Sequence, residues 1–221
     1  MVKSALVLGV GFLLTLSVPG SAQNPNASLP VQLRVSVPDR MLWAFRGSDT
    51  LMVAPIGVAT GATLAFAGKS WRFRTPQGVR RVLGKQTDPV WTPPDWHYAE
   101  AAREHGLRLV QLTRAGARLR RGLRLVVRDD VVSVLYPDGI IGQLPVDEHI
   151  VFDGVLFIPP YGTKNRVVTK ELGEFALDLG GGYLIHGTPD EESVGQLSTH
   201  GCIRMRAEDL AWLYEHVSVG T

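Results

Sequence analysis

Two stretches near the C-terminus carry most of the information in this sequence: residues 183–188 read YLIHGT and residues 199–204 read THGCIR. Tyr, Leu and Ile favour strands, so the first stretch predicts a short strand with His186 held rigidly at its end. The second stretch contains Cys202, the only cysteine of the 221 residues. Because His200 lies two residues before Cys202, an extended backbone directs both side chains to the same face. Together the stretches predict a β structure with a thiol close to imidazoles.

A thiol next to an imidazole indicates nucleophilic catalysis. Cysteine attacks a carbonyl as the thiolate, yet a free thiol is mostly protonated near neutral pH. A neighbouring imidazole can accept that proton and leave an ion pair. His186 and His200 are both candidates for this base. Asp190 or a backbone carbonyl is the expected group that orients it.

The residues beside the thiol suit the other needs of acyl transfer. Gly201 permits a tight backbone conformation, so the amides around residues 201 and 202 can point at a developing oxyanion. Arg204 can face the same side and bind a carboxylate through two hydrogen bonds. The alternative for Arg204 is an ordinary structural or surface ion pair.

Two alternatives compete with a catalytic thiol. His186, His200 and Cys202 are all residue types that bind zinc, but a closely spaced cysteine pair, an HEXXH signature and an evident fourth ligand are lacking. A free cysteine can also be a small buried hydrophobic residue. In an oxidising compartment, however, an unpaired thiol is vulnerable to oxidation, which favours a functional reason for keeping it. We therefore expect a nucleophile and no metal.

Residues 1–22 have the features of a signal peptide. Lys3 is followed by an apolar run over residues 5–18 and by small residues that place a cleavage site after Ala22. The run is shorter than the ~20 residues of a membrane span, although an uncleaved anchor is the alternative. We expect an exported protein of the periplasm or cell envelope without an integral membrane domain. Residues 23–30 are polar and predict a linker.

Residues 31–221 predict a single, mainly β domain with one or two short helices. Alternating apolar residues and turn signals such as PDG at 137–139 mark the strands. Strands are expected at 31–37, 41–45, 50–56, 71–74, 123–127, 131–136, 175–179 and 183–185, and helices at 98–104 and 207–217. The prolines and tryptophans of residues 89–98 predict a fixed loop.

The charge balance argues against a nucleic-acid binder, since 23 basic and 21 acidic residues leave a net charge of +2. Eight arginines nevertheless crowd residues 103–128. This segment is either a solvated face or a patch that attracts an anionic polymer such as peptidoglycan. The glycine triplet at 180–182 is not followed by a helical pattern and does not predict a phosphate loop.

Residues 183–188 and 199–205, which contain the two stretches and Met205, resemble the L,D-transpeptidase catalytic domain, also called the YkuD domain. TPxG at 75–78, the Pro-Trp segment after it and Asn165 strengthen the resemblance, which runs from about residue 33 to the C-terminus. Thr199 stands where the family most often has Ser. Residues 108–153 look like an insertion beyond the minimal domain.

The resemblance implies a β-sandwich of the L,D-transpeptidase type with the active site at one end. It implies that Cys202 is the nucleophile, that His186 is its base and that the Gly187 carbonyl orients the imidazole. The substrate-binding and oxyanion residues implied by it are Thr199, His200, Gly201 and Arg204. No metal or organic cofactor is expected.

The reaction implied by the resemblance acts on peptidoglycan stem peptides that end in meso-diaminopimelate–D-Ala. Cys202 attacks the L,D bond, D-Ala leaves, and an amine of an acceptor peptide or protein resolves the thioester. If water resolves the thioester instead, the enzyme is a carboxypeptidase or endopeptidase. The third alternative is a non-enzymatic wall-binding module that works through the arginine-rich segment.

Overall fold

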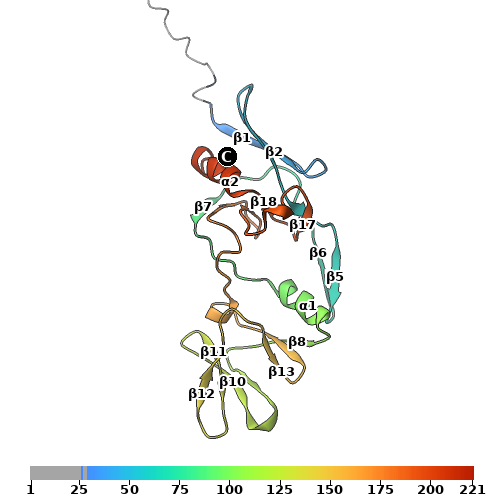
Figure 1. Ribbon diagram of the computed structural model, residues 1–221, viewed down its shortest axis with the longest axis vertical. Helices are drawn as coiled ribbons and strands as arrows, with labels where there is room; N and C mark the ends of the chain where they lie inside the picture. The colour runs from blue at the N-terminus through green and yellow to red at the C-terminus, as the bar shows by residue number, and fades with distance from the viewer. Residues whose placement is uncertain (1–25, 27–28) are drawn as a thin grey trace, which may run out of the picture.

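The computed structural model describes residue 26 and residues 29–221. The predicted signal peptide, residues 1–22, and most of the predicted linker lie outside the described residues. The described chain is elongated, with two lobes and the helix α1 (Asp95–Glu104) between them (Figure 1). In this described part, no helix is long and apolar enough to cross a membrane.

The upper lobe in Figure 1 is built from three small sheets and one helix. The sheets have the strand orders β1-β2-β3, β18-β16-β15-β7 and β17-β4. Their strands are β1 (Val31–Ser36), β2 (Met41–Arg46), β3 (Asp49–Pro55), β4 (Val58–Ala59), β7 (Gly84–Thr87), β15 (Phe175–Asp178), β16 (Leu184–His186), β17 (Leu197–Thr199) and β18 (Ile203–Arg204). The helix is α2 (Ala207–His216), and the hairpin β5 (Thr63–Phe66) and β6 (Lys69–Arg72) runs from this lobe towards α1.

One hydrophobic core joins the elements of the upper lobe. Leu42 and Ala54 of the first sheet, Leu177 and Ile185 of the second, and Leu213 of α2 belong to one cluster of buried side chains. Burying such side chains is the main favourable contribution to folding. This core fixes β16 and β18, the two strands that contain the predicted catalytic motifs.

The lower lobe has a core of its own. Its strands are β8 (Arg108–Gln111), β9 (Ala117–Arg118), β10 (Arg124–Arg128), β11 (Val131–Leu135), β12 (Ile141–Gln143), β13 (Ile150–Phe152) and β14 (Val155–Ile158). Leu112, Leu125 and Phe157 belong to a buried cluster that is separate from that of the upper lobe. The first and last strands, β8 and β14, pair in parallel. This separate core supports our proposal that residues 108–153 are an insertion.

A buried arginine, Arg166, stabilises the region between the two lobes. Arg166 is 1% exposed. Its guanidinium donates to the carbonyls of Pro93 (3.1 Å) and Pro159 (3.0 Å) and pairs with Asp95 at 2.7 Å. Because a buried charge is costly unless it is paired and hydrogen-bonded, these contacts hold the start of α1 in one position.

The mainly β prediction is confirmed, and the hairpin across the glycine triplet is present as antiparallel β15 and β16. The predicted fixed loop at residues 89–98 is partly wrong, because α1 begins at Asp95. Pro94 precedes the helix at its N-cap, where a missing N–H does no harm, and Asp95 adds a favourable acid in the first turn. Trp96 therefore lies on a helix rather than in a loop.

Candidate active site

The pairing of β16 with β18 brings the two motifs together. The strands are parallel, with His186 opposite Arg204 and Ile185 opposite Ile203. Cys202 immediately precedes β18. Since side chains two residues apart on a strand share a face, Cys202 and Arg204 both belong on the side of His186. The charge of Arg204 acts on the pKa of both His186 and Cys202, which is consistent with this arrangement.

The imidazole of His186 is buried and oriented by the next residue. His186 is 4% exposed, and its Nδ1 lies 2.6 Å from the carbonyl oxygen of Gly187. A carbonyl only accepts hydrogen bonds, so Nδ1 carries the proton and Nε2 keeps its lone pair. Burial lowers the pKa of His186 to about 4, against an opposing effect of the Gly187 bond. The neutral tautomer is therefore the one that can act as a base.

The backbone of Gly187 is itself held in place by a neighbouring turn. The Gly187 amide donates to the Leu172 carbonyl at 2.9 Å. Gly173 packs so closely that a Cβ built on it would lie 2.8 Å from the Gly187 Cα, and its φ of +70° also favours glycine. Leu172 and Gly173 are thus part of the site, although no motif in the sequence pointed to them.

Cys202 is half-buried at the edge of the same group. Its Sγ lies 3.9 Å from the Gly182 carbonyl oxygen, which can accept the thiol proton. Burial raises the pKa of the Cys202 thiol, while a backbone hydrogen bond from Leu184 and the charge of Arg204 lower it. Both shifts favour the neutral forms, a thiol at Cys202 and an unprotonated imidazole at His186. Desolvation disfavours both charged forms.

Thr199 shapes the loop that presents the thiol. Its hydroxyl donates to the Cys202 carbonyl at 2.7 Å and accepts the Gly201 N–H at 3.3 Å. The proton of the Gly201 amide is thus directed at Thr199 within the loop, and the oxyanion role of Gly201 stays a prediction. A serine hydroxyl makes the same two bonds, which explains how Thr can replace the more common residue.

Glycine is needed at position 201 because the Tyr183 ring lies very close to its backbone. Its φ is +155°, and a Cβ built on it would lie 2.7 Å from the Tyr183 ring. Any larger residue would collide with this aromatic wall or displace it. The predicted need for glycine beside the thiol is thus explained by Tyr183.

His200 turns away from the thiol towards α1. Its Nε2 lies 2.9 Å from Glu100 Oε2. The ring stacks on Trp96 at 3.8 Å between centroids and meets the edge of Phe73 at 4.4 Å. Because its contacts are with these residues, His200 is a candidate for positioning the loop, and His186 is the better candidate for the base.

Arg204 is the predicted carboxylate-binding residue of the site, and its Nε–H group has no hydrogen-bond partner in the described structure. Its Nη1 donates to Ser193 Oγ at 2.9 Å, and its main chain pairs with Gly57 in both directions. The Nε is buried without a hydrogen-bond partner in the described structure. An unsatisfied buried donor costs about 1–3 kcal/mol, so a ligand that accepts from this guanidinium would gain that energy.

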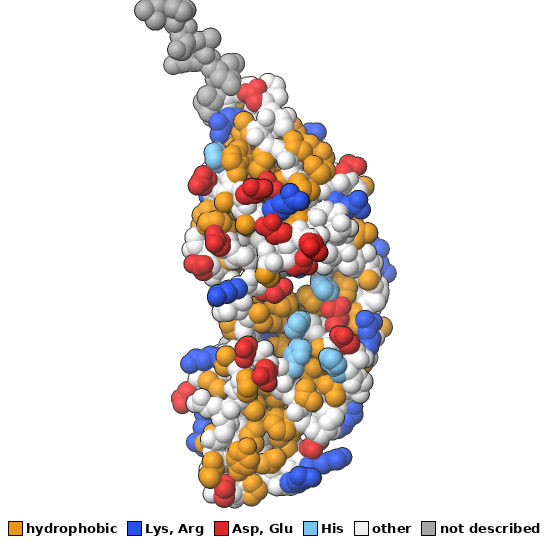
Figure 2. Space-filling view, viewed as in Figure 1, with side chains coloured by type: hydrophobic (Ala, Val, Ile, Leu, Met, Phe, Trp, Pro, Cys, Tyr) orange, Lys and Arg blue, Asp and Glu red, His pale blue; other side chains and the backbone are white. Residues whose placement is uncertain are grey.

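The zinc alternative requires His186, His200 and Cys202 at a single ion. The Nε2 of His200 is instead held by Glu100. Among the described residues, no group of three or more His, Cys, Asp or Glu side chains is placed to hold a metal. Other imidazoles gather at the junction of the lobes (Figure 2), where the Nε2 atoms of His97 and His149 lie 3.4 Å apart.

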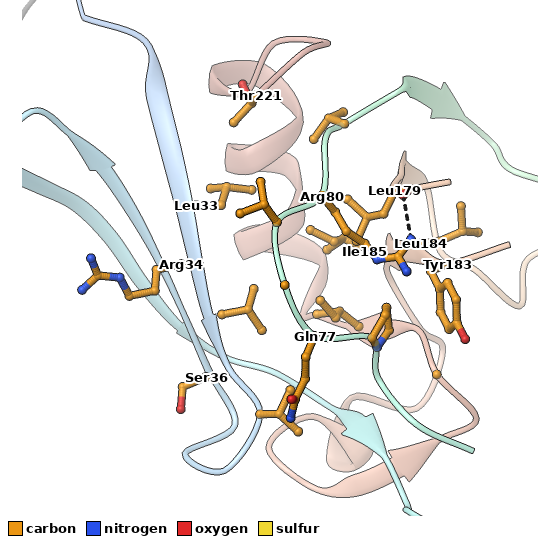
Figure 3. Close-up of a pocket in the computed structure, with 18 of the residues that line it drawn as sticks. Leu33, Arg34, Ser36, Gln77, Arg80, Leu179, Tyr183, Leu184, Ile185 and Thr221 are labelled. Carbon is orange, nitrogen blue, oxygen red and sulfur yellow. Dashed lines mark hydrogen bonds between the residues drawn. The ribbon is translucent and has the colours of Figure 1, made fainter. Parts of the chain in front are cut away.

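A cavity of about 540 Å³ adjoins the loop of the thiol. Figure 3 shows its walls, formed by β1 on one side and by the segment around Gln77 and Arg80 on the other, with Tyr183 close by. Arg80 donates to the Leu179 carbonyl at 3.4 Å and lies over the Tyr183 ring at 5.1 Å. Gly201 is also part of the lining, so this space reaches the catalytic loop.

The family follows from a comparison with known protein families. The family model YkuD, described as the L,D-transpeptidase catalytic domain, matches residues 30–221. The chain therefore belongs to this family.

Among curated proteins, the chain is 42% identical over 208 residues to "Probable L,D-transpeptidase ErfK/SrfK" of Salmonella typhimurium, covering 94% of this chain and 47% of that protein. It is 46% identical over 50 residues to "Probable L,D-transpeptidase YbiS" of Escherichia coli, covering 23% of this chain and 16% of that protein. The chain thus spans about half the length, or less, of these relatives. A solved L,D-transpeptidase from Xylanimonas cellulosilytica has 14% identity and a TM-score of 0.44, covering 89% of this chain and 60% of that one.

Proposed function

We propose that this chain is a cysteine L,D-transpeptidase that cross-links or modifies peptidoglycan stem peptides through a thioester on Cys202. The observation that supports this most is the contact of His186 Nδ1 with the Gly187 carbonyl, 2.6 Å, on the strand beside the only cysteine. It leaves the other ring nitrogen as a base within a buried site. Export to the periplasm or cell envelope is part of the proposal.

In the first step, His186 takes the proton of the Cys202 thiol as the sulfur attacks the carbonyl carbon of the L,D bond. The charge that develops on the carbonyl oxygen is stabilised by N–H donors of the loop, for which the Cys202 amide is our candidate. The C–N bond then breaks. The leaving D-Ala amine receives the proton from His186, and a thioester remains on Cys202.

In the second step, an acceptor amine attacks the thioester carbonyl. His186 accepts a proton from that amine, the C–S bond breaks, and the sulfur regains a proton. A new peptide bond joins acceptor and donor. Because both steps use the same base in its neutral form, burial that keeps His186 unprotonated at neutral pH suits the cycle.

Arg204 is the proposed anchor for a substrate carboxylate. Its buried Nε has no partner among the described residues, while Nη1 is held by Ser193. A carboxylate that accepts from the guanidinium would be placed next to Cys202 and His186. Such positioning contributes to catalysis by fixing the reacting atoms.

The test is incubation of the purified protein with a stem tetrapeptide and a second peptide that has a free amine. Mass spectrometry of the products should show release of D-Ala and a joined product. Release of D-Ala with only a shortened tripeptide would identify water as the acceptor and favour the carboxypeptidase alternative. Absence of any change in the tetrapeptide would contradict the enzyme and leave the wall-binding alternative.

A further inference from the structure

A small cleft in the lower lobe combines arginines with apolar walls. Its volume is about 250 Å³. Arg108, Arg118 and Arg120 line it together with Phe152 and Phe157, and Asp153 is the acidic residue of the lining. The cleft is built wholly from the arginine-rich segment and its partner strands, so it is distinct from the site around Cys202.

The backbone brings these arginines to one place. Arg108 of β8 is in register with Val155 of β14. Arg118 of β9 leads into the 3-10 turn that contains Arg120. The Arg120 amide donates to Asp153 Oδ2 at 3.0 Å, which ties this turn to the end of β13. The cleft is therefore formed where the ends of four strands meet a turn that is held by a hydrogen bond.

The arginine side chains of this region form no ion pair within the described chain. Arg118 stands directly opposite Arg124 in the β9–β10 pair. Like charges in directly opposite positions destabilise a sheet. None of the four ion pairs found among the described residues includes Arg108, Arg118, Arg120 or Arg124. An external anion would offset this repulsion.

Asp153 lies in the cleft, where its carboxylate accepts the Arg120 amide, and other acidic residues of the lobe make their contacts elsewhere. Asp130 pairs with Arg114 at 2.9 Å, and the Asp138 side chain accepts the Ile140 amide in its own turn. In Figure 2, Lys and Arg side chains are spread around the margin of this lobe, while apolar side chains cover its centre. The lining of the cleft itself has three arginines and one aspartate, so it is basic on balance.

We propose that this cleft binds carboxylates of peptidoglycan stem peptides and so docks the enzyme on the polymer. The proposal rests on the proposed function, because it takes the polymer on which Cys202 acts as the ligand. Guanidinium groups match carboxylates through paired hydrogen bonds, and the phenylalanines offer an apolar surface to the neighbouring peptide. A weak second contact raises the local concentration of donor peptides at the catalytic site.

The test compares the wild type with the triple variant Arg108→Ala/Arg118→Ala/Arg120→Ala in co-sedimentation with purified insoluble peptidoglycan. The bound fraction at low salt should fall by roughly fivefold or more, since exposed ion pairs are each modest but act together here. Arg72→Ala, an exposed arginine of β6, is the matched control and should bind as the wild type does. Turnover of a soluble tetrapeptide should be unchanged in both variants.

Each outcome has a defined meaning. Equal binding of the triple variant, or an equal loss in Arg72→Ala, overturns the cleft as a docking site. Binding that persists on glycan strands stripped of their stem peptides, or that depends on added phosphate polymers, overturns the carboxylate assignment. A thermal unfolding curve checks that the variant is folded, and the single variants Arg108→Gln and Arg118→Gln give the same comparison if it is not. A wild type that binds the polymer but does not turn over the tetrapeptide contradicts the proposed function and not the cleft.

Discussion

His186 donates its Nδ1 proton to the carbonyl of Gly187, the next residue in the chain, over 2.6 Å. The Gly187 amide donates in turn to the Leu172 carbonyl, and Gly173 packs against the Gly187 backbone. The orientation of the imidazole therefore depends on a turn that lies about thirty residues before Cys202 in the chain. This dependence can be measured.

Gly173→Ala should impair catalysis through the position of His186. The new Cβ would lie 2.8 Å from the Gly187 Cα, so the Gly187 backbone must shift. A misplacement of about 1 Å can cost roughly 10²-fold in rate, and we expect a loss of at least tenfold in tetrapeptide turnover. Gly68→Ala is the matched control, with a φ of +76° and open space around it. Both variants should lose similar stability from the positive φ, and equal activities would contradict the role of Gly173.

His186→Ala and His200→Ala should differ in how far they slow the formation of the thioester. Removing a general base typically costs ~10²–10⁴-fold, and this loss is expected for His186→Ala. His200 contacts Glu100 and Trp96, so its removal should cost less. Rapid-mixing measurement of thioester formation distinguishes them. A larger loss in His200→Ala would make His200 the base.

Glu100→Gln should loosen the catalytic loop with little effect on overall stability. The Glu100–His200 contact is 2.9 Å, with both side chains about one third exposed (34% and 32%). Such partly exposed pairs contribute ~0.2–1 kcal/mol, so the unfolding free energy should change by no more than that. Acylation of Cys202 should slow measurably. Glu104→Gln on the same helix is the control, and an equal rate in both variants would show that α1 does not restrain the loop.

Unfolding experiments should show the burial of His186 as a loss of stability in acid. Its pKa is lowered from 6.5 to about 4 in the folded protein. Between these values the unfolded chain binds the proton and the folded chain does not, so stability is complete above pH 6.5 and falls as the pH drops towards 4. The shift corresponds to roughly 3 kcal/mol. His186→Gln should lose this part of the pH dependence in urea unfolding at pH 7.5 and 4.5.

A control variant separates the effect of His186 from that of His97. Burial also lowers the pKa of His97 to about 4, so some acid dependence should persist in His186→Gln. His97→Gln should remove that remaining part and leave the part that belongs to His186. If His186→Gln retains the full wild-type dependence, the imidazole is not held neutral by burial.

The sequence pointed to candidate site residues more clearly than to the segments that support them. Alternation and turn signals located most of the long strands, and the motifs named Cys202 and His186. Strands of two to four residues, such as β17 and β18, are too short for periodicity to reveal. The choice between His186 and His200 depended on α1, which lies a hundred residues away in the chain and supplies Glu100.

The hydrogen bonds of the Gly201 amide were hidden from the sequence for a related reason. Spacing placed the Gly201 amide beside the thiol, but not the Thr199 hydroxyl that accepts its proton at 3.3 Å. Similarly, Gly173 is one glycine among 24, and only the packing of its backbone against Gly187 identifies it. Contacts between distant segments decide both points.

The central claim is that Cys202 is an activated, accessible nucleophile. Intact-protein mass spectrometry after mixing with a carbapenem tests it directly, because a strained amide is opened by the same thiolate and oxyanion donors that open a peptide. The wild type should gain a single drug-sized mass increment, located by peptide mapping on Cys202, and folded Cys202→Ala should gain none. An unmodified wild type, or an equal adduct on Cys202→Ala, would contradict the account.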